Sequence, residues 1–191
     1  MRIVSETRRP LLERAPPASA RLHPWSRGQG EVPGVFVEAR AAREVEAQVK
    51  GGQSKGHEVL GLLAGDRFRT PGGAVIAVAT AAVTSPLSAT SAHVRFEPTK
   101  FDELARSLDG LDFDFVIVGW YHSHLDHGCF LSPTDVSTQR RYFAAPHQFG
   151  WVLDPLRREA AAFRVVGSQS ARVGLRVFDS PSRSRAPDTL R

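Results

Sequence analysis

The stretch FVIVGWYHSH, Phe115 to His124, constrains the fold more than any other part of the chain. Its apolar residues occupy both odd and even positions. Because successive side chains of a strand point to opposite faces, both faces of this strand are expected to be buried. A strand of that kind lies in the interior of its sheet. The sequence therefore predicts a central sheet with other structure packed against it.

Further strand and helix patterns alternate on either side of this stretch. The helix after the first strand is expected to stop at Gly51-Gly52, and the strand that begins at Glu58 is expected to end in the turn-like GDR after Ala64. The next expected strand, residues 74–83, is close enough in the sequence to pair with the strand from Glu58 as an antiparallel neighbour. The result is an α/β or α+β domain with a mixed sheet and about three helices. The other expected strands are 34–39, 74–83, 150–155, 161–166 and 171–178, and the expected helices are 41–50, 98–110 and one that starts at Ser132.

The length and composition predict one soluble domain. A chain of 191 residues can bury one full core, which we expect over residues 33–178, with a flexible arm at 1–32 and a flexible tail at 179–191. The single cysteine, Cys129, allows no intramolecular disulfide, and the sequence contains no long apolar run and no apolar signal core. We therefore expect a cytoplasmic protein without a membrane partner.

The net charge of +5 raises the question of a nucleic-acid partner. Most of the positive charge is arginine, with only three lysines, and the arginines are scattered, several of them in the two tails. Scattered charge forms no continuous basic surface, so the pattern argues against nucleic acid.

Polar residues gather at the end of the central strand. His122 and His124 are two residues apart on a strand, so their imidazoles leave the same face. Asp135, on the first turn of the following helix, offers a carboxylate. Two histidines and an aspartate are a common ligand set of catalytic zinc, which keeps a fourth position for water.

Each of these residues has a structural alternative. Two histidines near a strand end are often hydrogen-bonded structural residues, and Ser132 to Asp135 can be simply a capped helix start. Cys129 could be a ligand or a nucleophile, but we favour a buried packing residue. The loop residues Asp126 and His127 are expected to be exposed. His57 is expected to flank the site, and we assign no partner to His93 or His147.

The same residues resemble a known family. His122-Ser123-His124, seven residues, Ser132, two residues and Asp135 reproduce H-[ST]-H-x7-S-x2-D, the signature of the JAMM (MPN+) metalloproteases. The sequence GHEVLGLLAG supplies Glu58 in the E-x-x-G-x-x-x-G context of that family. The segments GWYHSH, GCFLS, DVSTQ and VLDP are similar to the proteasome-lid and signalosome branch.

The resemblance implies a fold, a cofactor and residue roles. The fold would be the MPN (cytidine deaminase-like) fold, a mixed central β-sheet flanked by helices. His122, His124 and Asp135 would hold one Zn²⁺ per chain. Glu58 would accept a proton from water and pass it to the leaving amine, and Ser132 would donate a hydrogen bond to the oxyanion.

One departure from the family pattern concerns the loop after the second histidine. Leu125 stands where the family usually has proline, so the loop geometry is less constrained than the ligand set. The sequence after the motif is short, which leaves little room for the second insertion that helps larger members of the family to bind ubiquitin. Substrate recognition is therefore expected to use other surfaces, such as residues 84–97.

The resemblance implies a zinc-dependent isopeptidase or peptidase that cleaves after the C-terminal glycine of a ubiquitin-like protein or its conjugate. E1-like and E2-like proteins would act in the same pathway. Two alternatives stay open: a peptidase that trims sulfur-carrier proteins, and a non-catalytic MPN scaffold subunit.

Overall fold

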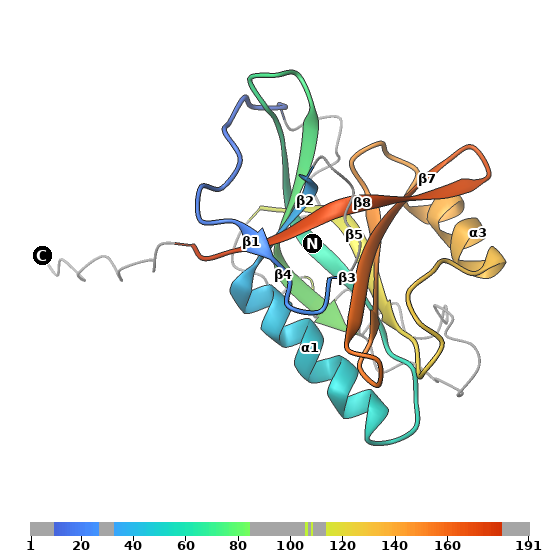
Figure 1. Cartoon of the computed structure of the whole chain (residues 1–191). Helices are drawn as coiled ribbons and strands as arrows, with labels where there is room; N and C mark the ends of the chain where they lie inside the picture. The colour runs from blue at the N-terminus through green and yellow to red at the C-terminus, as the bar shows by residue number, and fades with distance from the viewer. Residues whose placement is uncertain (1–9, 27–32, 85–105, 107, 109–113, 181–191) are drawn as a thin grey trace, which may run out of the picture.

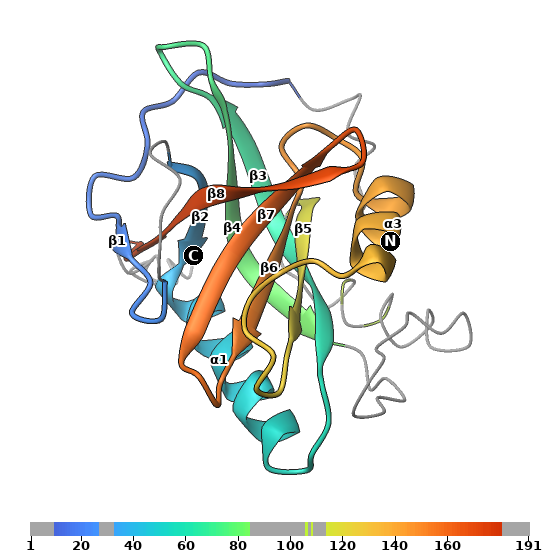
Figure 2. The ribbon, with the colours of Figure 1, turned by 45° about the vertical axis from the view of Figure 1, so that its right-hand side comes forward.

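The computed structural model describes residues 10–26, 33–84, 106, 108 and 114–180. One large mixed sheet carries a helix on either side (Figure 1; Figure 2), which confirms the predicted fold class. The strands are β1 (Arg21–Leu22), β2 (Pro33–Glu38), β3 (Leu60–Arg69), β4 (Val75–Thr84), β5 (Val116–Ser123), β6 (Phe149–Asp154), β7 (Glu159–Val166) and β8 (Gln169–Phe178), and the helices are α1 (Ala39–Gln53) and α3 (Pro133–Tyr142).

The strands follow the order β1-β8-β2-β4-β3-β5-β6-β7. β8 pairs with β7 through its first half and with β2 through its second half, so the sheet closes on itself. β2 is parallel to β4 and β8, β5 is parallel to β6, and the remaining pairs are antiparallel. β5 lies between β3 and β6, as its apolar pattern predicts.

Apolar side chains cover both faces of β5, because its alternate residues enter two different clusters. Tyr121 belongs to the cluster under α1, together with Val45, Val49 and Trp151. Trp120 belongs to the cluster on the α3 side. The sheet is therefore the middle layer between the two helices, and the site residues lie on the α3 side.

α1 runs through the glycine pair that was expected to end it. The helix continues to Gln53, and Gly52 is buried in its last turn. A Cβ atom at Gly52 would lie 2.5 Å from Val59 Cγ1 and 2.9 Å from the carbonyl oxygen of His57. The glycine thus serves a close approach between the helix and the segment that leads into β3, and the prediction of a helix stop is wrong.

β3 likewise continues through the predicted turn at Gly65-Asp66-Arg67. The strand reaches Arg69, and its register against β4 shifts between Ala64 and Gly65. A Cβ atom at Gly65 would lie 2.0 Å from the carbonyl oxygen of Val78, so this glycine accommodates the bulge. The actual turn follows at Thr70 to Ala74, where the amide of Thr70 donates to the carbonyl of Ala74 at 2.8 Å.

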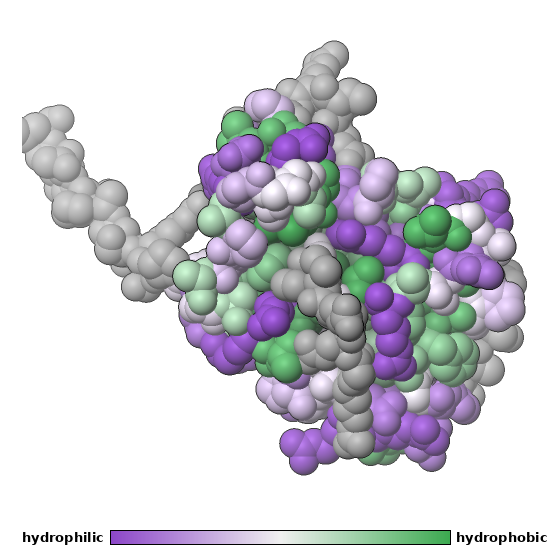
Figure 3. All heavy atoms as spheres, turned by 45° about the horizontal axis from the view of Figure 1, so that its top comes forward, coloured by the Kyte–Doolittle hydropathy of each residue, from purple (hydrophilic) through white to green (hydrophobic). Residues whose placement is uncertain are grey.

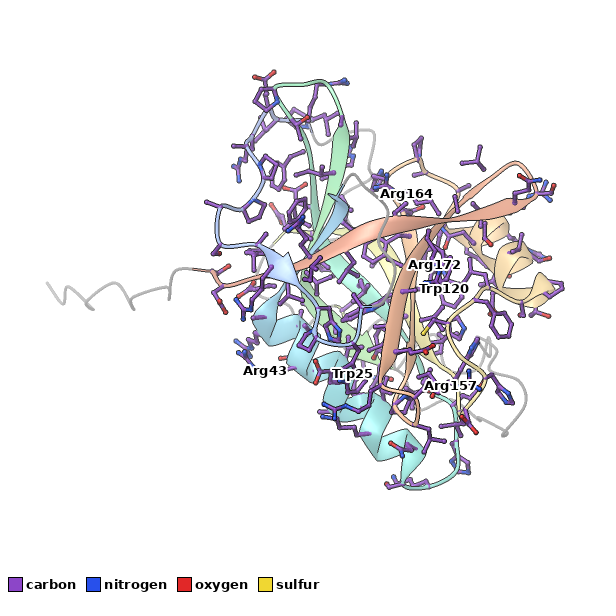
Figure 4. All side chains as sticks on the ribbon, in the orientation of Figure 1. Trp25, Arg43, Trp120, Arg157, Arg164 and Arg172 are labelled. Carbon is purple, nitrogen blue, oxygen red and sulfur yellow. The ribbon has the colours of Figure 1, made fainter. Side chains whose placement is uncertain are left out.

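Residues 10–26 pack against the domain, so the prediction of a loosely attached arm is wrong for this part. β1 pairs with β8, and the amide of Ala160 donates to the carbonyl of Trp25 at 2.9 Å. His23 is 2% exposed and hydrogen-bonds Glu46 of α1 at 2.9 Å. Trp25 lies beside α1 (Figure 4), with the Lys50 ammonium 5.4 Å from its ring centroid.

Two sequence predictions fall on other parts of the chain. The helix expected over 98–110 and the recognition segment expected over 84–97 lie almost entirely outside the described residues. Hydrophilic and hydrophobic residues are interspersed over the face shown in Figure 3. Within the described ranges, no helix is long and apolar enough to cross a membrane.

Candidate metal centre

The two histidines of the motif converge at the carboxyl end of β5. His122 is on the strand and His124 directly follows it, where the amide of His124 still donates to Leu153 of β6 at 2.9 Å. Both are buried, at 3% and 6% exposure. Their Nε2 atoms lie 3.0 Å apart, which is the result expected from the two-residue spacing.

Asp135 reaches the same point from the first turn of α3. Ser132 is the N-cap, its side chain accepts from the amide of Asp135 at 3.2 Å, and Asp135 Oδ2 accepts from the amide of Ser132 at 2.7 Å. This reciprocal capping box fixes the start of the helix. Asp135 Oδ2 then lies 3.6 Å from His122 Nε2. The three candidate ligand atoms, one from each of His122, His124 and Asp135, all lie within 4.8 Å of one another.

The donor set fits a zinc ion. Two ligands of a tetrahedral zinc lie ~3.3 Å apart when the bonds are about 2.0–2.1 Å long. The two separations that involve His122, 3.0 Å to His124 and 3.6 Å to Asp135, are close to this value. Burial lowers the pKa of His122 to about 4, so its imidazole is neutral near pH 7 and can act as a ligand. His124 Nδ1 lies 2.6 Å from the carbonyl oxygen of Gly128, which can only accept, so Nδ1 carries the proton and the lone pair of Nε2 is free.

Glu58 is held beside this centre by pairing between β3 and β5. Leu60 lies directly opposite His122, and Val59 and Ser123 exchange two hydrogen bonds of 2.9 Å, one of them through Ser123 Oγ. Two residues before Leu60, Glu58 shares the face of the histidines. It is 8% exposed. Its burial, together with the negative charges of Asp135 and Asp154, raises the pKa of the Glu58 carboxyl to about 7.

The remaining candidates lie outside this cluster. Cys129 is buried among apolar residues, and its thiol donates to the carbonyl of Val152 at 3.4 Å. Burial raises its pKa to about 12, which suits a packing residue. Asp126, His127 and His57 are exposed, as expected for the first two. His147 is buried elsewhere, where burial lowers its pKa to about 4, and His93 is outside the described residues.

Two side chains hold His122 in place: Trp120, which the sequence places in the packing behind the ligands, and Gln139, which sequence reasoning missed. Trp120 stacks on His122, and its indole donates to Gln139 of α3. Trp120 and Arg172 of β8 lie on the side of the sheet that faces α3 (Figure 4). Gln139 is a polar residue that is 2% exposed, but only the helical spacing from Asp135 could have drawn attention to it.

An exposed aromatic residue was also missed. The ring of Phe130 lies 4.7 Å from that of His124 and is 47% exposed, between the buried residues Cys129 and Leu131. The ring of Phe130 extends the aromatic surface of His124 toward solvent. The sequence signal was weak, because one aromatic residue in a loop has many structural explanations.

Comparison with known proteins identifies the family. The profile of the JAB1/Mov34/MPN/PAD-1 ubiquitin protease family matches residues 32–147, more than half of the chain. The chain belongs to this family. The match includes all five residues of the JAMM motif, and the MPN fold agrees with the topology above. The solution structure of protein DSY2949 from Desulfitobacterium hafniense has the same fold, with a TM-score of 0.56, 17% identity, and coverage of 78% of this chain and 95% of that one.

Several curated relatives of this MPN domain are named as subunits of the COP9 signalosome complex or of the 26S proteasome. COP9 signalosome complex subunit 5 from Debaryomyces hansenii is 25% identical over 88% of this chain and 34% of that protein, and subunit 5b from Arabidopsis thaliana is 28% identical over 76% and 40%. The 26S proteasome non-ATPase regulatory subunit 14 from Dictyostelium discoideum is 33% identical over 52% of this chain and 32% of that protein. The chain therefore spans less than half the length of these relatives.

Proposed function

We propose that this MPN domain is a zinc-dependent isopeptidase or peptidase that cleaves after the C-terminal glycine of a ubiquitin-like protein. The observation that carries the proposal is the convergence of His122, His124 and Asp135 within 4.8 Å, beside a buried glutamate. Two buried imidazoles that face one another together with a carboxylate are the ligand arrangement of a metal centre. Family membership and the names of the relatives support a ubiquitin-like substrate.

The proposed metal is one Zn²⁺ per chain, held by His122 Nε2, His124 Nε2 and Asp135. A bound zinc ion supplies Lewis-acid chemistry: it lowers the pKa of water to about 7 and polarises a carbonyl group. The capping box orients Asp135, and the hydrogen bond to Gly128 orients His124. These contacts pre-organise the ligands before metal arrives.

Glu58 and Ser132 carry the proton transfer and the oxyanion contact. The Glu58 carboxyl, whose pKa is raised to about 7 in the metal-free protein, would accept a proton from the attacking water and release it to the leaving amine. Because Ser132 Oγ accepts the amide of Asp135, its own hydroxyl hydrogen is available to donate to the oxygen of the scissile carbonyl. The substrate tail would bind as an extended strand, and its terminal glycines would suit a narrow site.

The exposed ring of Phe130 offers an apolar contact for the substrate beside His124. No membrane or nucleic-acid partner is required by this reaction, and it can take place in the cytoplasm. E1-like and E2-like proteins would be needed only if the substrate is a conjugate.

The decisive experiment compares the wild-type protein with Glu58→Gln. Purified protein is assayed for zinc content and incubated with ubiquitin-like proteins carrying a C-terminal peptide or an isopeptide-linked lysine. We expect about one zinc per chain in both proteins, chelator-sensitive cleavage by the wild type, and a loss of at least about 10²-fold in the variant. Glu44→Gln, on the opposite side of the sheet, is the matched control and should cleave normally.

The same experiment separates the alternatives. Zinc content near zero in the wild type would favour the scaffold subunit. Cleavage of linear fusions alone would favour a trimming peptidase, such as one acting on sulfur-carrier proteins. Cleavage by Glu58→Gln at the wild-type rate would show that the assigned mechanism is wrong.

A further inference from the structure

Asp154, the last residue of β6, is a fully buried carboxylate that accepts hydrogen bonds from two segments of the chain. Oδ1 accepts from the amides of Leu156 and Arg157, both at 3.1 Å, in the turn that leads to β7. It also lies 3.3 Å from the amide of Asp126. Oδ2 accepts from the amide of Gly128 at 2.7 Å. Gly128 lies in the loop between β5 and α3, 26 residues earlier in the sequence.

Gly128 links this carboxylate to a candidate ligand. Its amide donates to Asp154, while its carbonyl oxygen receives the Nδ1 hydrogen of His124 at 2.6 Å. The glycine has a φ of 76°, a conformation that other residues adopt only with strain. A bond from an amide to an ionised carboxylate is stronger than one between neutral groups. The position of the Gly128 carbonyl is therefore set largely by Asp154.

We propose that Asp154 is a positioning residue for the metal centre: by holding Gly128, it fixes the orientation and the Nδ1–H tautomer of His124. This inference rests on the proposed function, because it concerns how strongly His122, His124 and Asp135 bind zinc. Groups that fix the second ring nitrogen of a ligand histidine typically change metal affinity by 10–100-fold when they are removed.

An ordinary structural role, the capping of the turn after β6, involves only Oδ1. The two roles can therefore be separated by Asp154→Asn. The amide oxygen of the new side chain can replace Oδ1 and keep the bonds to Leu156 and Arg157. Its NH₂ group then faces the backbone N–H of Gly128. Because both groups are hydrogen-bond donors, the bond between residue 154 and Gly128 is lost.

The test measures the zinc affinity of the full chain by competition with a chromogenic chelator. We expect Asp154→Asn to bind zinc 10–100-fold more weakly than the wild type. The matched control is Arg157→Ala, which removes the exposed ion pair with Asp126, 3.1 Å long, between the same two loops. Because its backbone bond to Asp154 is retained, this variant should bind zinc within about twofold of the wild type.

A second measurement does not depend on the folding of a variant. Nitrogen-15 spectra of the zinc-free wild type should show His124 as the Nδ1–H tautomer, with a slowly exchanging Gly128 amide. An Nε2–H tautomer, or equal zinc affinity in Asp154→Asn and the wild type, would overturn the inference and leave the proposed function intact. Equal losses in Asp154→Asn and Arg157→Ala would overturn it too. Failure of the wild type to bind zinc would reject both.

Discussion

The indole of Trp120 and the imidazole of His122 are stacked, with ring centroids 4.8 Å apart and planes inclined by 11°. The two residues are two apart on β5, so they share the face of the sheet that α3 covers. The indole N–H of Trp120 donates to Gln139 Oε1, and Gln139 Nε2 donates to the carbonyl of Phe143 at 2.8 Å. The helix that carries Asp135 is thus tied to the strand that carries His122.

Replacement of Gln139 by leucine should weaken this connection. The change leaves the indole N–H of Trp120 and the carbonyl of Phe143 buried without these partners, so the free energy of unfolding should fall by about 1–3 kcal/mol. Zinc affinity should fall several-fold, because Trp120 no longer restrains the plane of His122. Urea denaturation and chelator competition measure the two effects. The control on the same helix is Ser137→Ala, an exposed position at which both quantities should stay within error.

The local parts of the candidate centre could be predicted from the sequence. The i, i+2 spacing places His122 and His124 on one face, and the capping box of Ser132 and Asp135 spans four residues. Both patterns depend only on backbone geometry near the residues concerned. The central position of β5 followed in the same way from its apolar pattern.

The distant contacts could not be predicted. Gly52 was read as a helix stop, but its lack of a side chain serves contact with Val59 beside Glu58, a tertiary requirement. The sequence likewise predicts a turn at Gly65, but this glycine is required by its close approach to the carbonyl oxygen of Val78 in the neighbouring strand. The bond between Asp154 and Gly128 joins two loops, and no local pattern marks it. A single sequence does not distinguish a glycine required by a turn from one required by a neighbouring strand.

Ser132 has two roles that can be separated. Ser132→Ala removes the N-cap oxygen and the proposed oxyanion donor, so unfolding free energy should fall by about 1 kcal/mol and kcat by about 10²–10³-fold. Ser132→Gly should lose as much activity but only a few tenths of a kcal/mol of stability, since glycine is a tolerated N-cap. Denaturation and fusion-cleavage kinetics provide the measurements. Ser132→Thr, which keeps the hydroxyl, is the control; normal kcat in Ser132→Gly would exclude the oxyanion role.

The segment around Trp25 should contribute to stability although the sequence suggests a loose arm. Trp25 is 8% exposed and lies over α1, so Trp25→Ala should reduce the free energy of unfolding by about 3 kcal/mol. Leu22→Ala, at a side chain that is 42% exposed in β1, should cost less than about 1 kcal/mol. Urea denaturation of both variants gives the comparison. Equal, small losses would mean that residues 10–26 do not form part of the cooperative unit.

Glu58 should destabilise the metal-free protein at neutral pH. Its folded-state pKa of about 7 lies above the ordinary glutamate pKa of 4.5, so the folded protein binds a proton that the unfolded chain releases between these pH values. The stability associated with this proton is fully present below pH 4.5 and is lost as the pH rises to about 7. Glu58→Gln does not titrate and should therefore be more stable than the wild type above pH 7.

The rise in the Glu58 pKa from 4.5 to about 7 corresponds to about 3.4 kcal/mol at about 1.4 kcal/mol per pKa unit. We expect a smaller gain in the free energy of unfolding at pH 8, roughly 2 kcal/mol, because water screens part of the electrostatic interaction. At pH 4.5 the two proteins should unfold at the same urea concentration. Both proteins are measured in chelator, with Glu44→Gln, at a partly exposed acid of α1, as the control for the Glu-to-Gln substitution itself. A gain that is equal at both pH values would mean that the substitution improves packing, and that the Glu58 carboxylate is not held in an unfavourable environment. That result would remove the physical basis for a proton acceptor poised near pH 7.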